Sequence, residues 1–330
     1  MISDAVFTDP PPKIDLGLVF ALHVFDGTAR EIGWDQLDGA QDGMVWLHLD
    51  RSSVDAQRWL RGQSGIARDA VEALLEEDTR PRVAAFGDDR LVILRGLNLN
   101  PGAEQTDLIA LRCLVTQDRL ITLRLHRVMA VRELRQRITR EPEQSWTPGA
   151  IVTELTTNLV TRIEPVVAQL RDSVDQLEER DTAKADRDTI SKARRDAIFL
   201  RRYLAPQRDA VQQLAVDRSA LFTDDNRIRL REQADSLTRA TEDLDSARDR
   251  AAVLSEQAAA SIAEELNRRT YTLTVIAAIF LPLGFITGLL GVNVGGIPLQ
   301  DSPLGFTLVC GGLLVLTALV LLIVRRLGWL

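Results

Sequence analysis

Asn293 is a polar residue in an otherwise glycine-rich and apolar part of the chain. It lies in the segment GVNVGGIPLQDSP at residues 291–303, between two long apolar runs. A lone asparagine among glycines is often only a turn residue. If several copies of the chain meet around one axis, however, their amide oxygens form an uncharged ring that accepts hydrogen bonds from the water shell of a cation. Asn293 is therefore a candidate contact for a hydrated ion.

The apolar run before Asn293 carries a stripe of polar and small residues. Steps of three and four residues along this run stay on one face of a helix. The stripe consists of Asn267, Thr270, Thr274, Ala277, Leu281, Gly284, Gly288 and Gly291. Such a stripe can line a pore, but small residues four apart are also a common face for packing between membrane helices. The residues alone leave both interpretations open and favour packing.

Residues suited to catalysis are not grouped anywhere in the sequence. His23, His48 and His126 lack the short spacings of zinc ligands, and the two cysteines lie far apart. Phosphate-binding loops, nucleophile elbows and metalloprotease motifs are missing too. The formal net charge of −7 argues against nucleic acid as a partner. We therefore expect no enzyme, no nucleic-acid binding and no permanently bound cofactor.

Two uncharged runs, residues 271–290 and 304–324, predict membrane-spanning helices. Each has about 20 residues, which is enough to cross a hydrocarbon core of roughly 30 Å. Backbone groups in lipid must form their hydrogen bonds within the protein, so we expect both runs to be helical. Asp301 is the one charged residue between Arg269 and Arg325.

The arginines that flank the two runs predict their orientation. Arg268 and Arg269 precede the first run, and Arg325 and Arg326 open a basic tail, residues 325–330, after the second. The loop between the runs has no lysine or arginine. By the positive-inside rule, both termini are cytoplasmic and the loop faces outward from the cell inner membrane.

The N-terminal part, residues 1–147, has the pattern of a compact cytoplasmic α/β domain. Short apolar stretches bounded by Gly, Asp and Pro predict strands. The predicted strands are residues 16–25, 44–49, 91–99, 108–116 and 120–125, and the predicted helices between them are residues 53–61 and 67–77. This pattern belongs to a domain of ordinary size.

The pattern is helical from residue 148 onward. Residues 148–225 predict a helical hairpin with a polar turn at 181–188. Pro165 and Pro206 should kink or split its helices, because proline removes a backbone hydrogen bond and clashes with the preceding turn.

Residues 226–290 predict one stalk helix that continues into the first span, with Thr223 or Asp225 as its N-cap. Apolar residues along it alternate spacings of three and four. This apolar seam consists of Leu237, Ala240, Leu244, Ala247, Ala251, Leu254 and Ala258. It fits a coiled coil between copies of the chain and, equally well, an amphipathic helix packed on its own domain.

The order Gly291-Val292-Asn293 after an apolar span resembles the Gly-Met-Asn signature of CorA-type divalent cation transporters. Val292 stands where that signature has Met. The wider string IFLPLGFITGLLGVNVGGIP, residues 279–298, is similar to the ZntB branch of zinc transporters in this superfamily.

Further stretches are similar to the same branch. They are DTRPRV at residues 78–83, LRGLNLNPGAE at residues 94–104 and the basic end before Trp329 and Leu330. The resemblance covers essentially the whole chain.

This resemblance implies a funnel-shaped homopentamer in a lipid bilayer. Each chain would have an N-terminal α/β/α sandwich, a long helical stalk and two C-terminal transmembrane helices. The first span would line a central pore for divalent metal ions, above all Zn²⁺. Gly291, Val292 and Asn293 would form a selectivity filter at the outer mouth, with Asn267 and Thr270 facing the inner pore.

The resemblance also implies roles for charged residues. Asp301 would attract cations at the outer mouth, and Arg325 and Arg326 would lie near the cytoplasmic exit. Asp249 and Glu256 are candidates for sensing cytoplasmic metal. Two alternatives stay open: a Mg²⁺, Co²⁺ or Ni²⁺ channel of the same superfamily, and a membrane-anchored coiled-coil scaffold or sensor that needs neither Asn293 nor the glycines.

Overall fold

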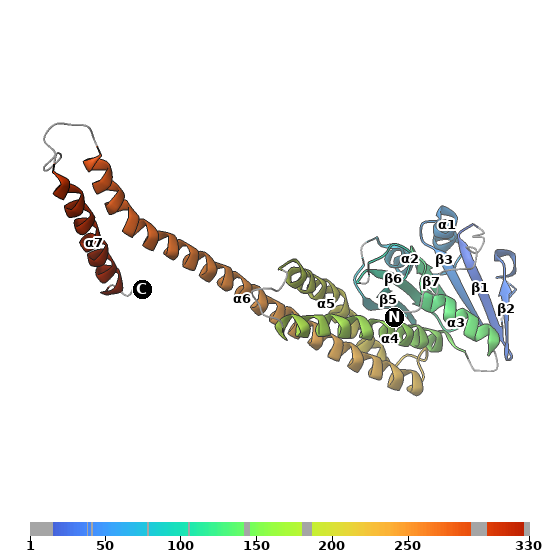
Figure 1. Cartoon of the computed structure of the whole chain (residues 1–330). Helices are drawn as coiled ribbons and strands as arrows, with labels where there is room; N and C mark the ends of the chain where they lie inside the picture. Colours follow the sequence, from blue (N-terminus) through green and yellow to red (C-terminus); the bar gives the residue numbers. More distant parts are fainter. Residues whose placement is uncertain are drawn as a thin grey trace. The chain divides into compact units, whose positions relative to one another are not determined.

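A computed structural model describes residues 16–37, 39–40, 42–77, 79–104, 106–141, 146–179, 187–291 and 302–326. Within these residues, one seven-stranded sheet has the order β2-β1-β3-β7-β6-β5-β4 (Figure 1). Its strands are β1 (Leu18–Phe25), β2 (Thr28–Ile32), β3 (Met44–Asp50), β4 (Arg82–Phe86), β5 (Asp89–Leu97), β6 (Leu108–Val115) and β7 (Arg119–Arg124). β3 and β7 are parallel, and the other neighbouring strands are antiparallel.

The five strands predicted from the sequence are confirmed, whereas β2 and β4 were missed. These two strands form the edges of the sheet. Neither contains a fully buried residue, so their sequences lack the apolar pattern of an interior strand. The apolar pattern that predicts a strand depends on burial, so it was weakest in the two edge strands, which are exposed to solvent.

Helices cover both faces of the sheet and give it the predicted three-layer arrangement. α1 (Val54–Gly62) and α2 (Arg68–Leu75) pack on one face through a cluster that includes Leu60 and Leu74. α3 (Met129–Arg140) and the start of α4 (Pro148–Glu179) cover the other face. α3 was not predicted, although Val131, Leu134 and Ile138 bury one side of it. A short 3-10 helix, η1 (Trp34–Gln36), follows β2.

The predicted helical hairpin is present as α4 and α5 (Arg187–Ala215). Neither helix is split at its proline, so of the two expected effects only a kink at Pro165 or Pro206 stays a prediction. Pro165 and Thr161, whose carbonyl loses its helical donor, are both exposed, so water can reach that carbonyl. Most of the predicted turn at 181–188 lies outside the described residues.

α6 (Asp224–Leu290) is one continuous helix, as predicted (Figure 1). Thr223 is its N-cap, because Thr223 Oγ1 accepts the Asn226 N–H at 3.2 Å while Asn226 Oδ1 accepts the Thr223 N–H at 3.2 Å. By its contacts the chain divides within α6 into one compact unit up to Leu254 and a second from Ser255.

The apolar seam of α6 is buried within its own chain. Leu237, Leu244 and Leu254 join one cluster with apolar residues of α4 and α5. Ion pairs between α6 and these helices flank the seam: Arg229 with Glu154, Arg171 with Asp243, Arg201 with Asp245, and Arg250 with Asp175 and Glu178. Of the two explanations, packing on its own domain is therefore correct, and the seam offers no free surface for a coiled coil.

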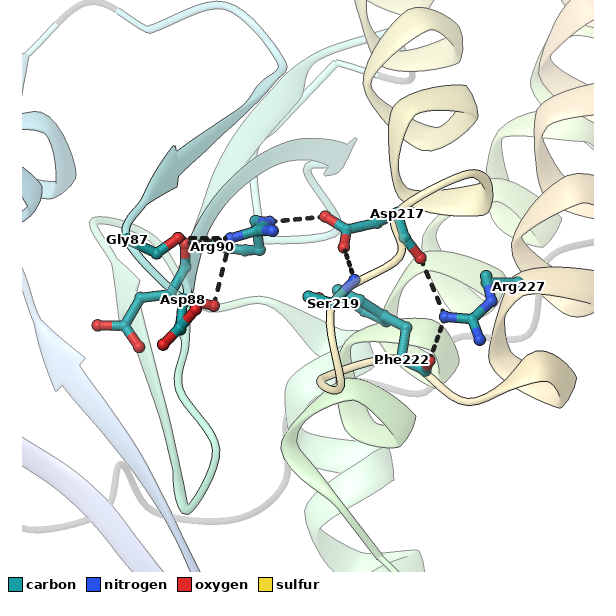
Figure 2. Close-up of polar contacts among 8 residues, drawn as sticks. Gly87, Asp88, Arg90, Asp217, Ser219, Phe222 and Arg227 are labelled. Carbon is teal, nitrogen blue, oxygen red and sulfur yellow. Dashed lines mark hydrogen bonds and ion pairs between the residues drawn. The ribbon is translucent and has the colours of Figure 1, made fainter.

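A polar link joins the sheet to the connection between α5 and α6 (Figure 2). Arg90 Nε donates to Asp217 Oδ2 at 2.6 Å, and the two side chains are only 16% and 10% exposed. The Ser219 N–H donates to Asp217 Oδ1 at 2.7 Å. Arg227 of α6 donates to the carbonyl oxygens of Asp217 and Phe222. The start of α6 is thus fixed to the β4–β5 hairpin.

Candidate functional site

Two helices carry large apolar side chains outward. In α6 beyond Leu254, Leu273 is 68% exposed and Leu281 is 72% exposed. In α7 (Pro303–Arg326), Leu314 is 72% exposed. Each helix contains an uncharged stretch long enough to cross a membrane, and almost none of it is buried inside the chain. Lipid or other copies of the chain must cover these surfaces.

The predicted stripe lies on one face of the membrane part of α6. Because the helix is unbroken from residue 267 to 290, steps of three and four keep these positions on one side. Asn267, Thr270 and Thr274 are exposed there. The Thr274 hydroxyl donates to the Thr270 carbonyl at 2.9 Å, which satisfies its hydrogen while its oxygen can still accept.

The glycines of the stripe border open space. A side-chain carbon added at Gly284 or Gly288 would meet no atom of the chain within 4 Å. The described part of the same chain, α7 included, therefore does not use these glycines for close packing. The surface they form is free to meet another copy or a water-filled path.

Pro282 leaves one backbone carbonyl oxygen of this apolar stretch without a helical hydrogen bond. It has no N–H to donate, so the carbonyl of Ala278 lacks its usual helical partner. Both residues border an open groove of about 530 Å³, together with the stripe residues Thr274, Ala277 and Leu281. Sequence inspection placed Pro282 in the span but missed this oxygen, although proline inside a helical run is the signal for it.

The stripe ends where α6 ends. The Gly291 N–H donates to the carbonyls of Thr287 at 3.0 Å and Gly288 at 3.2 Å, which closes the last turn. Val292, Asn293 and Asp301 lie outside the described residues, so their predicted roles stay predictions. The neighbouring Thr287 hydroxyl donates to the Leu283 carbonyl at 2.9 Å.

Charges lie at the ends of the two membrane helices that are remote from the loop. Arg269 pairs with Glu265 just before the apolar stretch of α6. Arg325 and Arg326 are exposed in the last turn of α7, where the helix dipole favours positive charge. Arg268 and Arg269 thus precede the first apolar stretch, and Arg325 and Arg326 follow the second. The predicted orientation, with both termini in the cytoplasm, depends on this placement of positive charge.

The residues predicted to sense metal are not brought together within one chain. Asp249 is exposed and pairs with Arg248 at 2.8 Å, and Glu256 is exposed further along α6. Among the described residues, no three His, Cys, Asp or Glu side chains are grouped so that they could hold a metal ion. Metal sensing at these two residues would need ligands from a second copy, and it stays a prediction.

Comparison with known proteins extends these observations. The family described as CorA-like Mg2+ transporter protein matches residues 41–326. The divalent cation transporter CmaX of Pseudomonas aeruginosa is 40% identical over 315 residues, covering 92% of this chain and 94% of that protein. The zinc transport protein ZntB of Pectobacterium carotovorum is 35% identical over 287 residues, covering 86% and 88%.

Solved structures show the same fold. The structure of full-length CmaX has a TM-score of 0.81 at 39% identity and covers 96% of this chain and 99% of that one. The complete structure of the CorA magnesium transporter from Methanocaldococcus jannaschii has a TM-score of 0.76 at 19% identity, with 94% and 98% covered. The sheet domain, the long helix and the two C-terminal apolar helices are thus shared over the full length, and the chain belongs to the CorA-like Mg²⁺ transporter family.

Proposed function

We propose that a homopentamer of this chain conducts Zn²⁺ through a central pore lined by the membrane part of α6. Family membership makes the chain a divalent cation transporter with two transmembrane helices and excludes an enzyme, as the sequence predicted. The number of subunits, the ion and the conducting residues are the proposal.

The observation that carries the proposal is the exposed, uncharged stripe of α6. A protomer with two membrane helices cannot enclose a path for water by itself, so several copies must surround one. Asn267, Thr270 and Thr274 offer oxygen atoms at one end of the stripe, and Gly284 and Gly288 leave room at the other. A symmetric ring of α6 helices with this face inward gives a narrow path with polar groups at its cytoplasmic end.

The chemistry of this path suits a hydrated ion. Amide, hydroxyl and carbonyl oxygens can bond the hydrogens of coordinated water, whereas no carboxylate or imidazole lies in the spans to replace that water. A ring of Asn293 amides at the outer mouth would provide the first such contact, with Gly291 and Val292 beside it. Asp301 would raise the local cation concentration there by its charge.

The choice of zinc depends on relatives rather than on ligands. Oxygen atoms alone do not separate Zn²⁺ from Mg²⁺, Co²⁺ or Ni²⁺. ZntB of Pectobacterium carotovorum, at 35% identity, is a zinc transport protein, while CmaX, at 40%, is a divalent cation transporter. Zinc is therefore our first choice, and a channel for Mg²⁺, Co²⁺ or Ni²⁺ is the alternative.

The flanking arginines support an orientation with both termini in the cytoplasm of an inner membrane. Arg268 and Arg269 then stand at the cytoplasmic start of the pore helix, with Arg325 and Arg326 beside the cytoplasmic exit. Asp249 and Glu256 are on the cytoplasmic part of α6, where metal sensing between subunits would use them.

Metal uptake into proteoliposomes tests the proposal. Zn²⁺ and Mg²⁺ fluxes are compared for the wild type and Asn293→Ala, with and without an imposed pH gradient, after both proteins are shown to have the same oligomeric mass. We expect zinc flux that falls at least tenfold in Asn293→Ala. Flux of magnesium without zinc would assign the other ion. The proposed pore would be refuted if an intact oligomer showed no metal flux, or if the flux were the same in the wild type and in Asn293→Ala.

A further inference from the structure

Prolines inside three of the long helices each free one backbone carbonyl oxygen. Pro165 is in α4, Pro206 is in α5 and Pro282 is in the membrane part of α6. Proline has no N–H, so the carbonyl four residues earlier loses its usual helical donor. A carbonyl oxygen without a donor is costly to leave in apolar surroundings. The surroundings of each freed oxygen therefore show what can supply the missing hydrogen bond.

In α4 and α5 the freed oxygens belong to exposed residues. Thr161 lies four residues before Pro165, and Arg202 lies four residues before Pro206. Both Thr161 and Arg202 are exposed, so water can take the place of the missing donor. In both helices that lie outside the membrane, the proline is thus placed where its freed oxygen is compatible with hydration.

The third freed oxygen, on Ala278, lies in the apolar stretch of α6 instead. Lipid chains offer no donor at that depth, so the donor must be protein or water. The oxygen borders an open groove of about 530 Å³ that is lined by Thr274, Ala277, Ala278, Leu281, Pro282 and Phe285. Of these residues only Thr274 has a side-chain donor, and its hydroxyl donates to the Thr270 carbonyl at 2.9 Å. The groove itself therefore supplies no side-chain donor for the Ala278 oxygen.

The groove is on the side of α6 that carries the stripe. At about 100° per residue, Ala278 lies about 40° around the helix from the stripe residue Thr274. Ala277 and Leu281, which also belong to the stripe, line the same groove. A water-filled path along this face would bring water to the freed oxygen, as solvent does in α4 and α5.

We propose that the Ala278 carbonyl, freed by Pro282, accepts a hydrogen bond from the water shell of the conducted cation. The inference rests on the proposed pore and adds a contact between the hydroxyls at one end of the path and the glycines at the other. In a symmetric assembly these oxygens form a ring, and the negative ends of their dipoles stabilise a cation without removing its water. Pro282 is then a positioning residue, because it acts by withholding an N–H.

A matched pair of substitutions separates the freed oxygen from the proline ring. Pro282→Ala restores the N–H, so the helical hydrogen bond to the Ala278 carbonyl can close. Lactic acid at position 282, introduced by suppressor tRNA, differs from that alanine only in an ester oxygen in place of the N–H. It leaves the Ala278 oxygen free although the ring is gone.

A third variant keeps one proline in the span but moves the freed oxygen. Pro282→Ala combined with Leu283→Pro frees the carbonyl of Ile279 instead of that of Ala278. Ile279 lies about 140° around the helix from Thr274, away from the stripe face. Zinc flux into proteoliposomes is measured for all variants after each is shown to have the oligomeric mass of the wild type.

We expect flux to fall at least tenfold in Pro282→Ala and in the double variant, and to stay within twofold of the wild type with lactic acid. Equal losses in Pro282→Ala and the lactic acid protein would assign the effect to the ring and overturn the inference. Full flux in Pro282→Ala or in the double variant would overturn it too. Asn293→Ala, measured alongside, separates this inference from the pore. Flux that depends on Asn293 but not on Pro282 contradicts the inference alone, whereas a wild type without zinc flux contradicts both.

Discussion

The two stretches of α6 differ in what covers their apolar side chains. In the N-terminal stretch, up to Leu254, Leu244 is 1% exposed and packs against α4 and α5 of the same chain. In the membrane stretch, Leu273 is 68% exposed although it belongs to the same continuous helix. One helix therefore has a stretch whose apolar seam packs within one protomer and a stretch whose apolar side chains are left for lipid or other copies to cover.

Truncating one leucine in each stretch gives the largest expected contrast. Leu244→Ala leaves a cavity in the core and should lower the free energy of unfolding of the N-terminal unit by about 2–5 kcal/mol. Leu273→Ala removes the same atoms from an exposed position and should leave that unfolding unchanged. Denaturant titration of both full-length variants in detergent measures the difference. Equal losses would show that the two stretches are not distinct.

The link between Arg90 and Asp217 sharpens the same contrast, because it anchors the N-terminal stretch of α6. Asp217→Asn removes the charge from a nearly buried ion pair and should cost about 1–3 kcal/mol at neutral pH. Asp224→Asn, whose carboxylate is 93% exposed while it pairs with Arg227, is the control and should cost far less.

The loss in Asp217→Asn should depend on pH. Burial alone would raise the pKa of Asp217, but hydrogen bonds from Ser219 and Arg90 outweigh it and hold the pKa below its ordinary value. A carboxyl with a lowered folded-state pKa stabilises the fold above its unfolded pKa, about 3.9, and loses that contribution as pH falls through the folded value. The wild type and Asp217→Asn should therefore converge in stability at acid pH. A constant difference down to pH 2 would contradict this account.

The N-cap of α6 gives the smallest expected effect. Thr223→Ala removes the acceptor for the Asn226 N–H and should cost about 1 kcal/mol. Thr238→Ala, within the same helix, removes a hydroxyl that donates only to the Ala234 carbonyl at 2.9 Å, and should be close to neutral. Thermal unfolding of both variants measures the contrast. A larger loss for Thr238→Ala would show that the start of α6 is fixed by other contacts.

The interior of the fold could be predicted from the sequence, and its margins could not. Interior strands such as β3 and β6 are mostly apolar and buried along nearly their whole length, so their pattern was sufficient. The edge strands β2 and β4 have no fully buried residue, so burial left no pattern in their sequences. α3 is different: Val131, Leu134 and Ile138 have the three-and-four spacing of a helix buried on one side, and this signal was overlooked.

The candidate site divides in the same way. Helical spacing alone placed Thr270, Thr274 and Gly284 on one face, and the continuous helix keeps them there. Spacing could not say that Leu237 and Leu254 pack within their own chain, because a buried seam and a coiled-coil seam have the same period. Nor could it find a pocket beside α3, because its lining also comes from β1, β2, β3 and β7, which are distant in sequence.

The central claim is that the stripe face of α6 lines the conducting path. Thr272 and Thr274 test it as a matched pair, because both are exposed and each hydroxyl donates to the carbonyl four residues earlier. They lie about 200° apart around the helix, so only Thr274 shares the stripe face. Each is replaced by cysteine in a Cys310→Ser background. Cys113 is left in place, since it is buried and burial raises the pKa of its thiol.

Zinc flux into proteoliposomes is then measured before and after treatment with a positively charged methanethiosulfonate reagent on both sides of the membrane. The account predicts that modification lowers the flux of Thr274→Cys at least tenfold and leaves the flux of Thr272→Cys unchanged. Inhibition of Thr272→Cys instead, or the same response in both proteins, would contradict a pore lined by this face.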